Sequence, residues 1–179
     1  MTAVLAAMLL VSCTEPRYKC NIYGTVNDPE LEGVCVFLVP FMEKVIEPTK
    51  ENLDSTFIKD GKFEFHTNVE RMGDIRLSKW HRRGFQNLLV ITEPGDIHVV
   101  IDRESYGSGT PQNDSLQVWK DFNKMCRERM VEAAGKEDFL TKETISREFV
   151  NRSLRMARAC GDSSTFAKFI FRMYGEEPR

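Results

Sequence analysis

The 179-residue sequence has five cysteines, but no two of them are separated by two residues. That spacing is typical of thiol–disulfide catalysts and of paired zinc ligands, so both motifs are excluded. Histidine is also scarce, and His66, His81 and His98 are too scattered in the sequence to indicate a metal site. The segment around Ser108 only approaches the Gly-x-Ser-x-Gly pattern of hydrolases, and its glycines are better explained as loop formers. We therefore expect no catalytic residue, no metal and no cofactor, and we predict that the protein is not an enzyme.

The sequence also lacks an excess of either charge. Its formal net charge is −2, with 29% charged and 41% hydrophobic residues. A chain this close to neutrality has no overall field that would attract nucleic acid, so we expect no nucleic-acid partner. The apolar fraction is that of a folded protein, and the length is sufficient for one sizeable core.

Long hydrophobic runs are absent, and the most apolar stretch lies at the beginning of the chain. Residues 3–12 are too few to span a bilayer but match the apolar part of a secretory signal. The sequence Leu10-Val11-Ser12-Cys13 resembles the lipobox of bacterial lipoproteins. This pattern predicts a lipoprotein signal peptide over residues 1–12, lipidation of Cys13 and a polar tether over residues 13–17. Met1-Thr2 lacks the usual positive charge, so an upstream start or an ordinary buried segment is the alternative.

Lipidation would determine the location of the protein. We expect a cell-envelope protein that is anchored to a membrane through Cys13 and faces the periplasm or the cell surface, with the outer membrane favoured. An exported compartment permits disulfides, and four further cysteines allow three pairings. We favour free thiols, because all four lie at apolar-periodic positions where cysteine behaves as a small hydrophobic residue; they are Cys20, Cys35, Cys126 and Cys160.

Residues 18–111 have the alternation and turn signals of β-structure. Asp60-Gly61 supplies the positive backbone angles of a tight two-residue hairpin turn. Residues 93–96 read as the longer loop of a second hairpin. Closely spaced strands of this kind favour an antiparallel β-sandwich over a parallel sheet. We expect about seven strands, over residues 18–26, 34–39, 55–59, 62–66, 74–77, 87–91 and 97–101.

Residues 112–179 have a helical period instead. We expect a first helix that starts at Asn113 or Asp114 and ends at Gly135. A second helix is expected from Thr141 to Gly161, and a third begins at Ser163 or Ser164. The chain is thus predicted to be α+β, with about three helices packed on the sheet.

The alternation also predicts which side chains form the core. We expect Phe63 and Phe65 to be buried, with the helix of Trp119 covering one open edge or face of the sheet. Their expected neighbours are Val36, Leu89, Val99 and Ile101.

Several short motifs occur in the order and spacing of a known family. They are Tyr23-Gly24-Thr25-Val26, Val36-Phe37-Leu38, Leu53-Asp54-Ser55, Asp60-Gly61-Lys62-Phe63-Glu64-Phe65, Glu93-Pro94-Gly95-Asp96-Ile97 and Gly109-Thr110-Pro111-Gln112-Asn113-Asp114. With the lipobox, they make residues 18–120 similar to the N-terminal domain of exported Bacteroidota lipoproteins, domain-of-unknown-function family 4369. The resemblance implies that relatives often carry a thioredoxin-like domain after the helices. That redox activity does not transfer, because this chain has no C-x-x-C pair to carry it.

Two basic segments are candidates for binding. The first mixes cations with aromatic rings and would suit an anionic or carbohydrate ligand, although a solvated connection is the favoured alternative; it comprises Lys79, Trp80, His81, Arg82, Arg83 and Phe85. The second is a row of arginines on the second helix, which we interpret as a solvated face, with an anionic lipid surface as the alternative; it comprises Arg147, Arg152, Arg155 and Arg158.

The expected function follows from the predicted lipid anchor and from the lack of a recognisable catalytic motif. We expect a lipid-anchored envelope protein whose sandwich is a non-enzymatic binding or docking module. The alternative is an accessory or truncated relative of the periplasmic thiol–disulfide lipoproteins, working beside a separate thioredoxin-like partner. If the protein is a docking module instead, we expect its partner to be another envelope protein.

Overall fold

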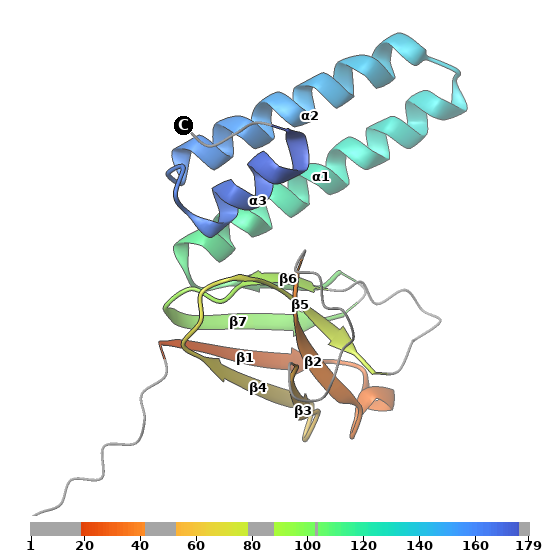
Figure 1. Ribbon diagram of the computed structural model, residues 1–179. Helices are drawn as coiled ribbons and strands as arrows, with labels where there is room; N and C mark the ends of the chain where they lie inside the picture. The colour runs from red at the N-terminus through yellow and green to blue at the C-terminus, as the bar shows by residue number, and fades with distance from the viewer. Residues whose placement is uncertain (1–18, 42–52, 79–87, 103, 176–179) are drawn as a thin grey trace, which may run out of the picture.

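A computed structural model describes residues 19–41, 53–78, 88–102 and 104–175. This part of the chain holds eight strands and three α-helices in the order strands then helices (Figure 1). The α+β class is therefore confirmed. The expected signal peptide, Cys13, the tether and the Lys79–Phe85 segment lie outside the described residues.

The strands form two four-stranded sheets. One sheet has the order β4 (Lys62–Thr67), β1 (Cys20–Val26), β7 (Gly95–Ile101) and β8 (Tyr106–Ser108). The other has the order β3 (Asp54–Phe57), β2 (Cys35–Pro40), β5 (Met72–Leu77) and β6 (Leu88–Ile91). One buried cluster draws residues from both sheets, as expected of a sandwich.

The core contains most of the residues expected from the alternation. Phe63 and Phe65 are buried in the cluster between the sheets, together with Val36, Val99 and Ile101. The placement of Leu89 was wrong, because Leu88 and Val90 are the residues of β6 that belong to this core. Neighbouring residues of a strand face opposite sides, so Leu89 is half-buried against the helical layer instead.

The connections differ from the expected hairpins. Residues 88–91 and 95–101 are not a hairpin, since β6 and β7 belong to different sheets. The tight turn at Asp60-Gly61 is confirmed: Lys59 N–H donates to Lys62 O at 2.8 Å, and both turn residues have positive φ. Its arms diverge, however, because β3 pairs with β2 and β4 pairs with β1. The chain thus passes from sheet to sheet at its turns.

These crossings bring distant segments together in one sheet. β1 pairs with β7 in parallel, from Cys20 opposite Gly95 to Val26 opposite Ile101. The expectation of a wholly antiparallel sandwich was therefore wrong for this pair. An eighth strand, β8, lies where a loop was expected and pairs with the end of β7.

The helices are α1 (Pro111–Gly135), α2 (Phe139–Ala159) and α3 (Thr165–Tyr174). Ser164 caps α3 as expected, with its side chain accepting the Ala167 N–H. Two helix starts were misplaced: α1 begins at Pro111, and Asp138 rather than Thr141 caps α2. Aspartate is a strong N-cap, and Thr141 supplies the N–H that it accepts. A short 3-10 helix, Pro29–Leu31, follows β1.

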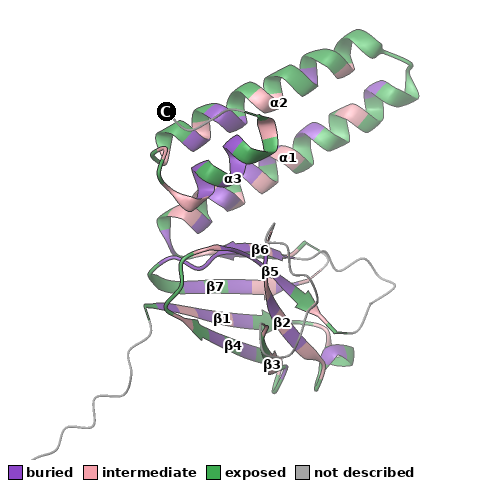
Figure 2. Ribbon diagram, in the orientation of Figure 1, coloured by how far each residue is buried: buried purple, intermediate pink, exposed green. Residues whose placement is uncertain are grey.

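The helical layer has a core of its own against one sheet. Trp119, Phe166, Phe169 and Ile170 pack with Met72 and Ile91 of the β5–β6 pair. Trp119 Nε1 also donates to Ser153 Oγ at 2.9 Å, which ties α1 to α2. The buried positions follow the inner sides of the helices (Figure 2). The expected cover of the sheet by the Trp119 helix is thus observed.

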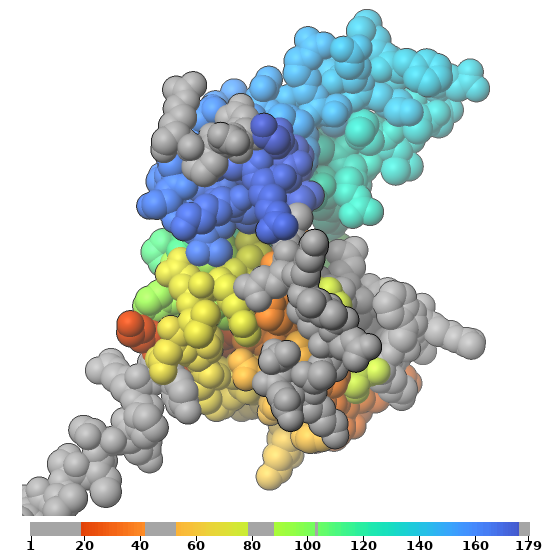
Figure 3. Space-filling model, viewed as in Figure 1, coloured from red at the N-terminus to blue at the C-terminus, as the bar shows by residue number. Residues whose placement is uncertain are grey.

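The hairpin of α1 and α2 extends well past the sandwich (Figures 1 and 3). Only the N-terminal part of α1 lies directly on the strands, and the rest stands away from them (Figure 1). Within the described residues, no helix combines the length and apolarity needed to cross a membrane.

Candidate binding cleft

The lateral side of the sandwich where β6 and β8 lie is covered by α1. Each of these two strands is the last in its sheet. A strand at the edge of a sheet has backbone groups without a strand partner and needs a cover. The first turns of α1 provide that cover through two side chains that lie one helical turn apart, Asn113 and Gln117.

Asn113 covers the edge of β6. Its Oδ1 accepts the Ile91 N–H at 2.9 Å, and its Nδ2 donates to Ile91 O at 2.7 Å. The side-chain amide therefore replaces a neighbouring strand at this residue. Asn113 is 2% exposed, so these bonds are made away from water.

Gln117 performs the same task on β8, where its Oε1 accepts the Gly107 N–H at 3.2 Å. Beside it, the Asp114 side chain accepts the Gly109 N–H at 2.9 Å. α1 is thus bonded to the edges of both sheets within its first two turns.

A buried carboxylate fixes the beginning of α1. Glu93 is 6% exposed, and its Oε1 accepts the N–H groups of Gln112 and Asn113 at 2.7 and 3.1 Å. A negative charge at a helix N-terminus is stabilised by the unpaired N–H groups there. Gln112 also accepts the Phe166 N–H at 3.0 Å, which connects α1 to the start of α3. Hydrogen bonds of Glu93 and Gln112 therefore connect the segment after β6 with the starts of α1 and α3.

Beyond Gln117, α1 leaves the sandwich and a cleft opens. Its volume is about 1040 Å³. Leu88 and Leu89 of β6, with Trp119 of α1, supply apolar walls. Its polar lining comes from the segment before and within β8 and from α1, and comprises Glu104, Ser105, Tyr106, Gln117, Lys120, Asp121, Asn123, Lys124, Arg127 and Glu128.

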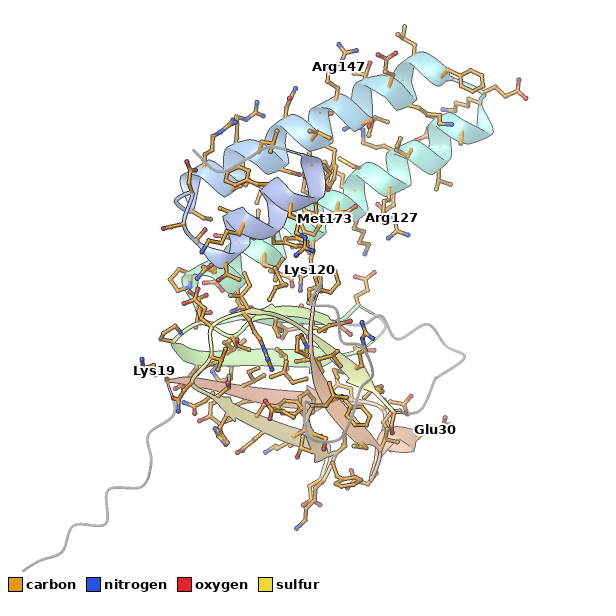
Figure 4. The ribbon with its side chains drawn as sticks, viewed as in Figure 1. Lys19, Glu30, Lys120, Arg127, Arg147 and Met173 are labelled. Carbon is orange, nitrogen blue, oxygen red and sulfur yellow. The ribbon has the colours of Figure 1, made fainter. Side chains whose placement is uncertain are left out.

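Three cations of α1, Lys120, Lys124 and Arg127, line this cleft together with two of its carboxylates, Asp121 and Glu128. Lys120 and Arg127 extend from α1 toward the sandwich side, whereas Arg147 extends from α2 on the far side of the hairpin (Figure 4). Lys124 forms an ion pair with Glu104 across the cleft. In the described part of the chain, neither Lys120 nor Arg127 has a carboxylate within ion-pair distance.

The environment of Lys120 is partly dehydrated. Burial lowers the pKa of its ammonium group to about 8, and the nearby charge of Asp121 offsets this effect only in part. Asp121 itself accepts a hydrogen bond from Gln117 Nε2 at 2.8 Å. A half-buried cation without an ion pair is destabilising, so Lys120 would gain from a bound anion.

The other predicted site residues do not assemble into a site. Arg147 pairs with Glu143, and the guanidinium of Arg152 lies over the Phe122 ring at 4.2 Å, so the arginine row is not a continuous free face. His98 stacks on Tyr23 on the outer side of a sheet, with ring centroids 5.7 Å apart. No group of three potential metal ligands occurs within the described ranges.

The described cysteines are free, with Cys20 and Cys126 buried. Burial raises the pKa of the Cys20 thiol to about 11, and it also raises the pKa of Cys126. A thiol is nucleophilic as the thiolate, so these shifts oppose thiol chemistry at neutral pH. Cys20 and Cys35 lie on strands of different sheets.

Sequence reasoning missed the cleft and its cations. Asn113 was interpreted as a helix cap, although its amide is used on β6. A signal was present, because Asn113, Gln117, Lys120, Lys124 and Arg127 follow the three- and four-residue spacing of one helix side. The helical period identifies this side of α1, but it does not show which strands lie opposite it.

Comparison with known proteins gives one match. A family model described as "Domain of unknown function (DUF4369)" matches residues 20–116. That range runs from β1 to the first turns of α1 and includes Glu93, Asn113 and both sheet edges. No curated protein and no solved structure matches the chain.

Proposed function

Because the chain belongs to the DUF4369 family, whose description names no activity, we propose a function from the geometry: it is a non-enzymatic docking module of the cell envelope. In this proposal the protein is anchored through lipidated Cys13, and a partner protein binds in the cleft between α1 and the β6–β8 side of the sandwich. The cleft carries the proposal. It combines apolar walls with two cations that lack ion pairs within the described chain, which is the mixed lining of a binding site.

The experiment is site-specific photocrosslinking in cells that make the lipoprotein. A photoreactive amino acid replaces Asn123, which lines the cleft, or Arg147, which lies on α2 away from it. We expect one reproducible envelope protein to crosslink at position 123 and not at position 147. The crosslink should be lost when Lys120→Gln and Arg127→Gln are combined.

Equal crosslinking at both positions, or a crosslink that survives the double substitution, would contradict the proposed cleft. The identity of the captured protein tests the alternative function as well. A partner that carries a thioredoxin-like C-x-x-C domain would make this protein a redox accessory, and any other envelope protein would make it a docking module of another system.

We also propose that the chain itself does not catalyse dithiol–disulfide exchange. The raised thiol pKa values and the absence of a C-x-x-C pair support this. The purified protein should fail to reduce insulin with dithiothreitol as the electron donor, and a clear turnover that disappears in Cys126→Ala or Cys160→Ala would contradict it.

A further inference from the structure

The edge of β6 is only partly covered. Ile91 directs its N–H and C=O toward α1, where Asn113 bonds to both. Residues two apart in a strand direct their backbone groups to the same side, so the N–H and C=O of Leu89 also point outward from the sheet. Within the described residues no backbone or side-chain partner for Leu89 lies on that side. Because Leu89 lines the cleft, one donor and one acceptor of an unfinished sheet face it.

The opposite wall of the cleft carries two cations that have no ion pair within the described residues. Lys120 and Arg127 are seven residues apart on α1, which places them two turns apart on one side of the helix. Between them Lys124 is neutralised by Glu104. Asp121 and Glu128 also line the cleft, but the helical period places both on one flank of this row. Two positive charges without an ion pair thus lie along the middle of the row, spaced along the helix axis.

The length of the cleft indicates an extended occupant. From Gln117 to Val131 the helix rises about 20 Å, at about 1.5 Å per residue. An extended peptide of about six residues has the same length at about 3.3 Å per residue. Its side chains alternate, so acidic groups would face Lys120 and Arg127 while apolar groups face Leu89 and Trp119.

Resting on the proposed docking function, we propose that the part of the partner bound in the cleft is an extended acidic peptide segment. Its backbone pairs with Leu89 at the free edge of β6, and its carboxylates form ion pairs with Lys120 and Arg127. This is strand addition, in which main-chain bonds supply affinity and the alternating side chains supply selectivity.

The test measures binding of a fluorescent hexapeptide in which valine alternates with glutamate, by anisotropy, to the full chain at physiological ionic strength. We expect saturable binding that weakens at least tenfold when glutamine replaces glutamate in the peptide. Lys120→Gln and Arg127→Gln should each weaken binding by a similar factor. Arg147→Gln, an exposed arginine on α2, is the matched control and should leave affinity unchanged. Thermal melts check that each variant is folded.

Two further arms separate strand addition from simple charge attraction. A peptide N-methylated at its central residue keeps its charge but loses a backbone donor, and it should bind at least tenfold more weakly. Combining Lys120→Glu with Arg127→Glu should reverse the preference, so that a valine–lysine peptide binds better than the glutamate peptide.

Equal affinity for the glutamate and glutamine peptides, no loss on N-methylation, or an effect of Arg147→Gln equal to that of Arg127→Gln would overturn the proposal. Dimerisation in sedimentation that Lys120→Gln abolishes would show instead that a second copy fills the cleft. A cleft crosslink to an envelope protein without peptide binding would reject the acidic segment and leave the docking function intact.

Discussion

The side chain of Phe65 shows how one residue contributes to the sandwich core. It lies 4% exposed in the cluster between the sheets, with its ring centroid 5.8 Å from that of Phe63. Phe65→Ala should lower the free energy of unfolding by about 3–5 kcal/mol, because it removes buried apolar area and leaves a cavity. Phe57→Ala is the matched control, since Phe57 is 64% exposed, and should change stability by less than about 0.5 kcal/mol. Urea unfolding checks both, and equal losses would show that the inward face is misassigned.

Lys120 should make stability depend on pH. Its folded-state pKa of about 8 lies below the usual 10.5, so the unfolded chain binds more protons between these values. The free energy of unfolding should therefore rise with pH from about 8 to 10.5, and the cost of the half-buried charge is complete below pH 8. The charge that acts on this amine is that of Asp121, and Glu104, Lys124, Arg127 and Glu128 line the same cleft.

Lys120→Met should remove that rise and stabilise the protein at pH 7 by roughly 1–2 kcal/mol, after allowance for partial solvent screening. Lys168→Met on α3 is the control, because Lys168 is exposed, and should leave the pH profile unchanged. Urea unfolding at pH 7, 9 and 10 measures the difference. A Lys120→Met variant that is less stable than the wild type at pH 7 would refute the argument.

At the scale of elements, α1 substitutes for the missing neighbour of two edge strands. Asn113→Ala should destabilise the protein by about 2–4 kcal/mol, because it leaves the N–H and C=O of Ile91 buried with fewer partners. Asn123→Ala, on the cleft side of the same helix, should cost less than about 0.5 kcal/mol. Amide hydrogen exchange at Ile91 gives an independent check, and unchanged protection in Asn113→Ala would contradict the edge-cover role.

The strands themselves were largely predictable. Alternation alone placed Phe63, Phe65 and Val99 correctly, since a half-buried strand must bury every second residue. Helix starts were less certain because several polar residues compete as caps, and Asp138 lies only three residues before Thr141.

The pairing of elements was not predictable from local patterns. The Glu93-Pro94-Gly95-Asp96 segment looks like a hairpin loop, but Glu93 bonds to the start of α1 and the chain changes sheets. The parallel partners β1 and β7 are separated by most of the sandwich domain, so no local signal relates them. The cleft depends on the same long-range arrangement, which is why the sequence analysis did not single out Lys120 and Arg127.

At the scale of the whole molecule, the proposed anchor and the cleft have separate roles. Cys13→Ala should move the protein from the membrane to the soluble fraction, because stable anchoring needs several acyl chains on that residue. The cleft is built from residues far along the chain, so the soluble variant should still bind the glutamate peptide. Fractionation with Cys160→Ala as control tests this, and a Cys13→Ala protein that remains in the membrane would contradict lipidation.

The position of β1 determines how the molecule would respond to tension on its anchor. β1 is the first strand in the described part of the chain. It lies between β4 and β7 rather than at an edge of its sheet. Its entry is also held, since the Lys19 N–H donates to Asn68 Oδ1 at 2.9 Å and Lys19 O accepts the Gly95 N–H at 2.8 Å. A pull along β1 from its N-terminal end loads two ladders in shear, so their hydrogen bonds resist together instead of opening one after another. The sandwich would thus serve as a mechanical clamp at the point where the proposed lipid tether transmits force.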